Sequence, residues 1–286
     1  MNTIDLIREY GQSLSGIPQP ITNVISGGLG ALLTIFLNGI FSTRRAILDE
    51  LKSLSTAYII AGDILNLALN LKEQHLQSLK TEYDELTEKY DEIRTINKGV
   101  LEASLKFFSL QSINFPTELL NKYIYEKLAL GAEGILTTLT LERATQGLAL
   151  SIRLRNVLCD EFQNKKFESF EHKLSVYLGL VYNDNVDERF RHNVEALSAQ
   201  TDDCIFFAKH LSEIIYSAEE KIRLKKVYYF LPGRKSFRIN WSQPERKGLF
   251  PPASNYSNWT GAFIKRLTFT QKMNKFHRKF ICQIND

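Results

Sequence analysis

The chain has 286 residues, with 36 Lys and Arg against 32 Asp and Glu and a formal net charge of +4. Its 44% hydrophobic content is ordinary and leaves material for a packed core in one or two domains. The three cysteines, Cys159, Cys204 and Cys282, are odd in number and far apart, which excludes a paired disulfide framework and suits a reducing compartment.

Residues 1–20 contain a short amphipathic piece and then SLSGIPQP, whose glycine and prolines interrupt a helix. We expect this segment to lie at a membrane surface. Residues 21–41 hold no charged side chain, and as a helix they rise about 30 Å, the thickness of a bilayer's hydrocarbon core. The sequence therefore predicts a single transmembrane helix. The alternative is a buried core helix of a soluble domain.

The charges that flank this span predict its orientation. Arg44 and Arg45 follow it directly, whereas Arg8 on the other side stands beside Asp5 and Glu9. Because cytoplasmic flanks carry the excess of Lys and Arg, we expect the bulk of the chain to be cytoplasmic. The first twenty residues are not basic and no small-residue cleavage site follows, so a cleaved signal peptide is not expected. The location predicted is the bacterial inner membrane, crossed once.

Small and polar residues recur through the span at steps of three and four, which places them on one helix face. They are Asn23, Gly27, Gly30, Thr34 and Asn38. In lipid, small residues let helices approach closely, and amide or hydroxyl side chains hydrogen-bond to a neighbouring helix. This stripe predicts a homo-oligomer. Dimerisation is the simpler outcome, and a ring of copies would line a water-filled path.

Residues 46–109 contain no proline and form the longest helical pattern in the chain. Within it runs a heptad seam made of Leu76, Leu79, Tyr83, Leu86, Tyr90 and Ile93. Extended backward, the pattern is interrupted at Lys72 and Gly62. We expect a long helix packed in an antiparallel bundle; the alternative is a free parallel coiled coil.

Further helices are expected from Glu118 to about Phe162, over 170–181 and over 186–224. The stretch LALGAEGILTTLTL is apolar enough to suggest a second span. Glu133 lies in its middle, however, and a charge at mid-bilayer costs about 3 kcal/mol. Residues 42–224 are therefore expected to form one helical bundle.

Residues 225–286 form a separate region by charge and composition. Residues 221–286 hold 15 Lys and Arg against two acidic residues, whereas residues 1–220 hold 21 against 30. β-rich runs on both sides of Pro232 suggest a hairpin or an irregular arm, 243–252 reads as a loop, and a basic amphipathic helix is expected over 259–284.

Five cations of this region are candidates for binding an anionic surface: Lys225, Lys226, Arg234, Lys235 and Arg238. Three interpretations are open. The tail docks on the acidic bundle, lies on membrane lipid of the anionic leaflet, or binds nucleic acid with aromatic rings stacking on bases. No recognised nucleic-acid module is present, so the third is not favoured.

Motifs that carry chemistry are missing from the sequence. It has no phosphate loop, no dinucleotide fingerprint, no G-x-S-x-G elbow and no H-E-x-x-H, and its five histidines are scattered. We therefore predict no enzymatic activity, no catalytic residues, no cofactor and no metal site.

The sequence predicts an all-α protein: an N-terminal single-pass transmembrane helix, a coiled-coil-like long-helix bundle and a basic, partly irregular tail. The leading functional hypothesis is a membrane effector that oligomerises and perturbs or permeabilises the membrane. Small accessory membrane proteins of bacterial antiviral defence have a similar layout, which is an analogy of plan and not of residues. The alternative is a passive anchor or scaffold that recruits a protein partner through the bundle and tail.

Overall fold

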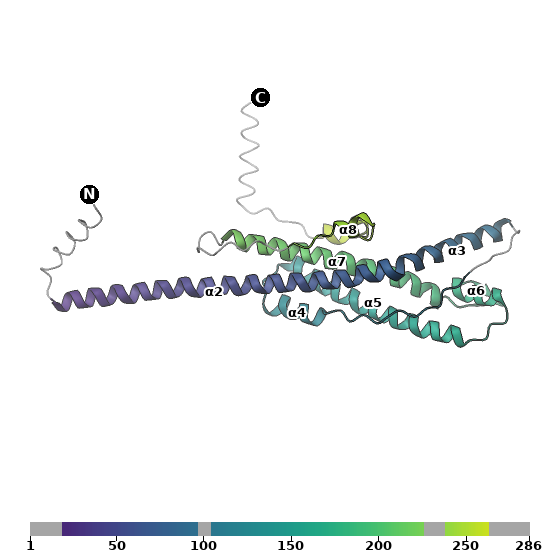
Figure 1. The fold of residues 1–286 in the computed structure, drawn as a ribbon, viewed down its shortest axis with the longest axis horizontal. Helices are drawn as coiled ribbons and strands as arrows, with labels where there is room; N and C mark the ends of the chain where they lie inside the picture. Colours follow the sequence, from purple (N-terminus) through teal and green to yellow (C-terminus); the bar gives the residue numbers. More distant parts are fainter. Residues whose placement is uncertain (1–18, 97–103, 226–237, 263–286) are drawn as a thin grey trace, which may run out of the picture.

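The computed structural model describes residues 19–96, 104–225 and 238–262, with side chains from residue 31 onward. These residues are predominantly helical, which confirms the all-α class. Figure 1 shows an elongated molecule in which one long helix, α2, passes through a bundle and projects far beyond one end of it.

The projecting helix and the expected long helix of the bundle are continuous. Helix α2 runs over Gln19–Leu71, a π-helical turn η2 covers Lys72–Leu76, and α3 continues over Gln77–Ile96. The π turn begins at Lys72, where the heptad pattern is interrupted. A π turn inserts one residue per turn and so shifts the register of the apolar face.

The chain after α3 corrects one sequence expectation. Residues 104–116 are not helical, so the helix predicted to continue to Ser109 is wrong for its last residues. Leu110 and Phe115 are buried by neighbouring helices. Side chains of the helix beside it, α5, hydrogen-bond to the backbone of this segment, and these bonds replace those that a helix would supply.

The single helix expected over 118–162 is two helices, α4 over Thr117–Glu126 and α5 over Ala132–Asn164. Leu128 and Leu130 between them are both buried. A helix would point these two side chains about 200° apart, whereas an extended chain turns alternate residues to one side. Burial of both leucines therefore explains the break.

A short helix and a hairpin connect α5 to the last long helix. Helix α6, Phe170–Leu178, ends at Gly179, which has a φ of 69°. Strands β1, Val181–Tyr182, and β2, Asn185–Val186, pair antiparallel around a two-residue turn in which both residues have positive φ. Helix α7 then covers Arg189–Lys225.

The described part of the tail crosses back over the bundle. It contains α8 at Ser242–Arg246, the 3-10 turn η4 at Ala253–Tyr256 and α9 at Ser257–Gly261. Helix α8 overlaps the start of the loop expected over 243–252, so that expectation is wrong for residues 243–246. The predicted hairpin around Pro232 and most of the final basic helix lie outside the described residues.

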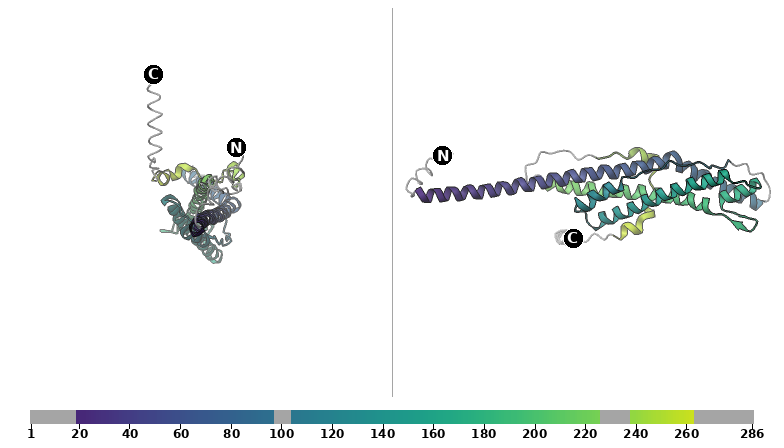
Figure 2. Two further views of the ribbon diagram at one scale, coloured as in Figure 1. Left: turned by 90° about the vertical axis from the view of Figure 1, so that its left-hand side faces the viewer. Right: turned by 90° about the horizontal axis from the view of Figure 1, so that it is seen from below.

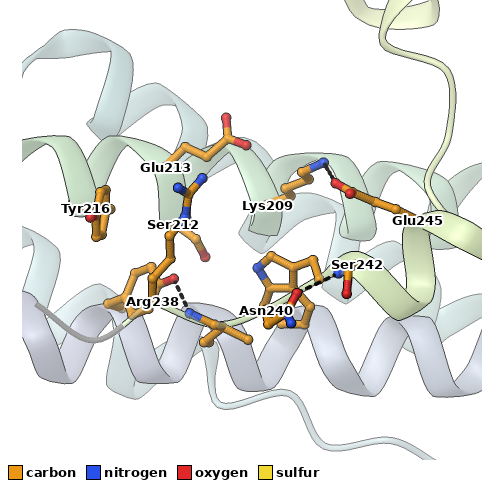
Figure 3. Close-up of a pocket in the computed structure, with 11 residues that line it drawn as sticks. Lys209, Ser212, Glu213, Tyr216, Arg238, Asn240, Ser242 and Glu245 are labelled. Atoms are coloured by element: carbon orange, nitrogen blue, oxygen red, sulfur yellow. Dashed lines mark hydrogen bonds and ion pairs between the residues drawn. The ribbon is translucent and has the colours of Figure 1, made fainter.

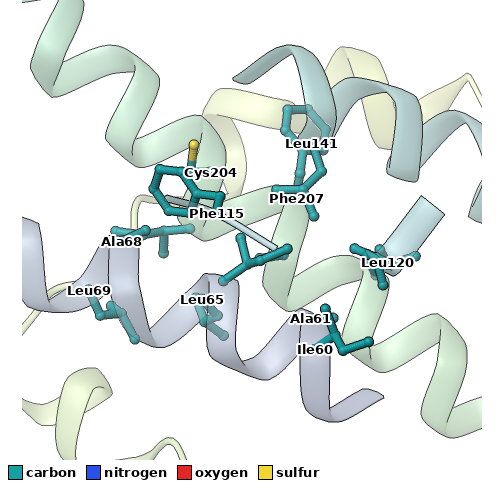
Figure 4. Packing of buried hydrophobic residues seen from close by; sticks show 14 of the residues in the cluster. Ile60, Ala61, Leu65, Ala68, Leu69, Phe115, Leu120, Leu141, Cys204 and Phe207 are labelled. Carbon is teal, nitrogen blue, oxygen red and sulfur yellow. The ribbon is translucent and has the colours of Figure 1, made fainter. Parts of the chain in front are cut away.

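The core is formed where α2, α4, α5 and α7 pack together. The long helices run along one another (Figure 2), and α7 packs against both α2 and α5. The main cluster includes Leu65 and Ala68 of α2, Leu120 of α4 and Phe207 of α7 (Figure 4). A second, aromatic cluster lies toward α6. The bundle therefore buries only the C-terminal half of α2.

Candidate functional site

The part of α2 that leaves the bundle is the most unusual surface of the molecule. Its large apolar side chains are exposed on most sides of the helix: Leu32, Leu33, Ile35, Phe36, Leu37 and Phe41. Ile35 is 69% exposed and Phe36 is 65% exposed. Soluble proteins rarely leave such a continuous apolar surface without a partner or a membrane.

One helix among the described side chains, residues 31–95, is long and apolar enough to cross a membrane by length and composition. Of its most apolar 18-residue stretch, 61% is buried inside the protein. The composition of this helix therefore does not locate a span by itself. The exposed residues before Arg44 are the ones that no other described element covers.

The structure places the expected polar stripe on the projecting half of α2. Thr34 and Asn38 are exposed and lie one helical turn apart. Asn23, Gly27 and Gly30 belong to the same helix, but their side chains are outside the described ones. The described pair shares one side of α2, as the sequence spacing requires.

The heptad seam packs against the chain's own bundle. Leu76 and Leu79 belong to the main core and Tyr83 to the aromatic cluster. The Tyr83 hydroxyl donates to the Leu178 carbonyl oxygen at 3.4 Å, and its ring lies 5.6 Å from that of Tyr177. Three further members are half-buried: Leu86, Tyr90 and Ile93.

Of the five cations expected to bind an anionic surface, the structure describes the side chain of one. Arg238 lies with its guanidinium carbon 5.5 Å from the centre of the Tyr216 ring. Lys225 is the last residue of α7. The other three, Lys226, Arg234 and Lys235, lie outside the described residues.

The described part of the tail, residues 238–262, packs on the bundle. Tyr256 stacks on Phe206 of α7 with ring centres 3.7 Å apart, and its hydroxyl donates to Asp203 at 2.9 Å. Trp259 packs edge-on against Phe207 at 5.0 Å. Two ion pairs add to this contact: Lys209 with Glu245, and Lys247 with Glu73. The aromatic contacts carry most of the docking because exposed ion pairs contribute little.

A buried arginine was not found from the sequence. Arg155 of α5 is 0% exposed and donates to the carbonyl oxygens of Lys106 and Phe108, each at 3.2 Å. Its guanidinium lies 5.1 Å from the Phe108 ring and 5.0 Å from the Phe190 ring. Burial lowers its pKa. The only available signal was an arginine in an apolar helix, which is too weak to predict such a role.

A second group that was not predicted from the sequence surrounds Arg189. Its guanidinium donates to both oxygens of Glu161 at 2.9 Å and to Asp187 at 2.8 Å. These hydrogen bonds hold the pKa of Asp187 and of Glu161 below their usual values. The group ties the start of α7 to α5 and to the hairpin, which is a structural role.

Asp203, which accepts the hydrogen bond from Tyr256 of the tail, has a raised pKa. Its burial raises the pKa, and the hydrogen bond from Tyr256 lowers it by a smaller amount. Among the residues that the structure describes, no three His, Cys, Asp or Glu side chains lie close enough to hold a metal ion.

Comparison with known proteins gives no match. No family model, no curated protein and no solved structure is significantly similar to this chain.

Proposed function

We propose that the chain is a membrane-anchored helical effector of the bacterial inner membrane, with its bundle in the cytoplasm. It would act without catalysis, by oligomerising through the projecting half of α2 and perturbing the bilayer. The observation that carries the proposal is the exposed apolar surface from Leu32 to Phe41, on a helix whose other half is core.

The energetics favour a lipid partner for this segment. Moving one large apolar side chain out of water is worth about 1.5–3 kcal/mol, so the six exposed residues together represent on the order of 10 kcal/mol. Lipid can cover all sides of a helix at once, whereas one protein groove covers only one side. Arg44 and Arg45 follow the segment and suit the headgroup region.

The polar stripe supports the oligomerisation part of the proposal. Thr34 and Asn38 lie on one side of the projecting helix. An amide that leaves water for lipid is stabilised by a hydrogen bond to a neighbouring helix. In a ring of copies, the same side would face a water-filled path.

The test is dye release from liposomes that contain the full chain. We expect the wild-type protein to release the dye and the double variant Asn23→Leu with Asn38→Leu to lose most of that release. The matched control is Thr22→Leu, which also exchanges a polar residue of the span for leucine but lies about 100° from Asn23 around the helix, off the stripe. Equal release by the control and the double variant would contradict a role for the stripe.

A passive scaffold is the second candidate, and one observation favours it. The outer face of α5 exposes an apolar row made of Leu136, Leu150, Leu154 and Val157. Such a row suits an amphipathic helix of a protein partner. Absence of dye release at any protein density would overturn the effector proposal. Loss of a co-purified partner on changing Leu150 to Glu would then support the scaffold.

A further inference from the structure

The described part of the tail first crosses α2 and then faces α7 (Figure 3). The Ile239 backbone N–H donates to the Tyr58 hydroxyl at 3.0 Å. The Ile239 side chain packs on Gly62, where a Cβ atom would collide with its Cδ1. The crossing encloses a cavity of about 530 Å³ beside Arg238. The contacts with Tyr58 and Gly62 therefore fix the start of the described tail on α2.

Further along, the contacts of the tail advance along α7 toward the C-terminal end of that helix. Tyr256 stacks on Phe206. Three residues later, Trp259 packs edge-on against Phe207, and its ring centre lies 5.4 Å from that of His210. Three residues of the tail thus advance the contact by about one turn of α7. In the same direction, the chain that follows α9 meets α7 beyond His210.

A groove of about 540 Å³ opens on α7 at that point. It follows α7 from His210 to Ile222, which is about 18 Å at the rise of a helix. Its other walls are α2 and the connection between α4 and α5. Apolar side chains line it: Leu54, Leu128, Leu130, Ile214, Ala218 and Ile222. The three from α7 are half-buried, so the described helices leave part of their apolar surface uncovered.

The same groove carries an excess of negative charge. Three elements each contribute one carboxylate: Glu50 from α2, Glu133 from α5 and Glu213 from α7. Lys221 opposes them, and the His210 Nε2 atom lies 3.2 Å from Glu133 Oε1. In the described ranges, neither Glu50 nor Glu213 has an ion-pair partner. An apolar groove with such carboxylates fits an occupant that is both apolar and cationic.

The segment that directly follows the described tail has this chemistry in its sequence. Residues 263–286 hold six Lys and Arg against one Asp. Three apolar residues stand at its start: Phe263, Ile264 and Leu267. Two cations lie between them: Lys265 and Arg266. Helical spacing would place the three apolar side chains on one side and the two cations on the other.

We propose that residues 263–286 dock in this groove as a partner within the same chain. The connection is short, because α9 ends at Gly261 and Trp259 already contacts His210 at the entrance. The length suffices, since the segment would extend about 36 Å as a helix. The docked segment covers the apolar row of α7 and compensates the carboxylates. The proposal is independent of the membrane function, because the groove and its occupant lie outside the predicted span.

The test is hydrogen–deuterium exchange of the full chain in uncharged detergent micelles, measured by mass spectrometry on the amides of residues 263–286. The reference is a synthetic peptide of the same residues in the same micelles, which accounts for binding to detergent. We expect exchange in the full chain to be slower by about tenfold or more, because a docked segment is open for only part of the time. Equal exchange in the chain and the peptide would overturn the proposal.

Charge reversal tests whether the segment lies in this groove. Glu50→Lys with Glu213→Lys should speed exchange of the segment about tenfold, because like charges then face each other. Lys265→Glu with Arg266→Glu should have the same effect from the side of the segment. All four substitutions together should restore slow exchange, which a misfolded variant would not do. Unchanged exchange in either double variant, or no recovery in the combined variant, would overturn docking in the groove.

A matched control separates the groove from the overall charge of the bundle. Glu92→Lys with Asp160→Lys makes the same change of charge at exposed positions of α3 and α5, toward the other end of the bundle (Figure 1). This variant should exchange as the wild type does, and faster exchange would overturn the proposal. Slow exchange that requires an anionic lipid in the micelles would assign the segment to lipid and would also overturn it.

Discussion

The two halves of α2 are both apolar, yet they have opposite surroundings. In the projecting half Leu33 is 59% exposed, whereas in the bundle half Leu65 is 0% exposed. The bundle half is covered by α4 and α7, and no described element covers the projecting half. An apolar helix must be covered by protein or by lipid. Only the packing of the other helices shows which half of α2 is covered by protein.

The uncharged part of this helix and its buried part are different segments. Residues 21–41, ahead of Arg44, hold no charged side chain. Within residues 31–95, the most apolar 18-residue stretch is 61% buried inside the protein. Exposure therefore supports a membrane span in the uncharged segment, because a buried leucine has no need of lipid. Substitutions that distinguish the halves therefore test this conclusion directly.

The largest expected effect is on the stability of the bundle. Leu65→Ala should lower the free energy of unfolding by about 2–5 kcal/mol, because it leaves a cavity in the core. Leu33→Ala should change that free energy by less than about 0.5 kcal/mol. Denaturant unfolding in detergent, followed by circular dichroism, measures both. Equal changes in the free energy of unfolding for the two variants would contradict the conclusion that only one half of α2 is packed in the bundle.

The next effect concerns membrane insertion. Leu33→Lys should disfavour insertion by about 3 kcal/mol, because it places a charge in the hydrocarbon core. Extraction of membranes with alkaline carbonate measures the fraction that remains inserted. The matched variant is Leu150→Lys on α5, where a leucine is 63% exposed on the bundle surface. Similar loss of insertion in both variants would contradict the assignment of the span.

The smallest expected effect is the change in the free energy of unfolding at low pH. It arises in the bundle, because residues 21–41 of the projecting half hold no ionisable side chain. The folded pKa of Asp187 lies below its unfolded value of about 3.9. The stabilisation is therefore present above that value and is lost as the pH falls through the folded pKa. Because Arg189 is half-exposed, the contribution is less than about 1 kcal/mol.

Arg189→Gln should remove this contribution, so the stability of the variant should fall less steeply than that of the wild type below about pH 4. Unfolding by urea between pH 7 and pH 3 measures the difference. Arg143→Gln, at an exposed arginine of α5, is the control and should keep the wild-type slope. A variant slope identical to that of the wild type would show that this ion pair does not contribute.

Local patterns determined much of this protein. Period-3.6 apolar spacing predicts the long helices, and the absence of charge between Glu9 and Arg44 predicts a transmembrane helix at residues 21–41. The interruption of the heptad seam at Lys72 coincides with the start of the π turn. These features depend on residues within a few turns of each other, so the sequence alone displays them.

Tertiary structure decided what depends on distant partners. Residues 104–109 belong to the predicted long helix but are not helical, because Arg155 and Asn156 of α5 hydrogen-bond to backbone groups of this segment. Gly62 interrupts the seam for a reason that only Ile239, far along the chain, reveals. The cavity beside Arg238 exists only because α2, α7 and the tail meet there. Contacts between residues far apart in sequence leave no periodic signal, so folding alone specifies them.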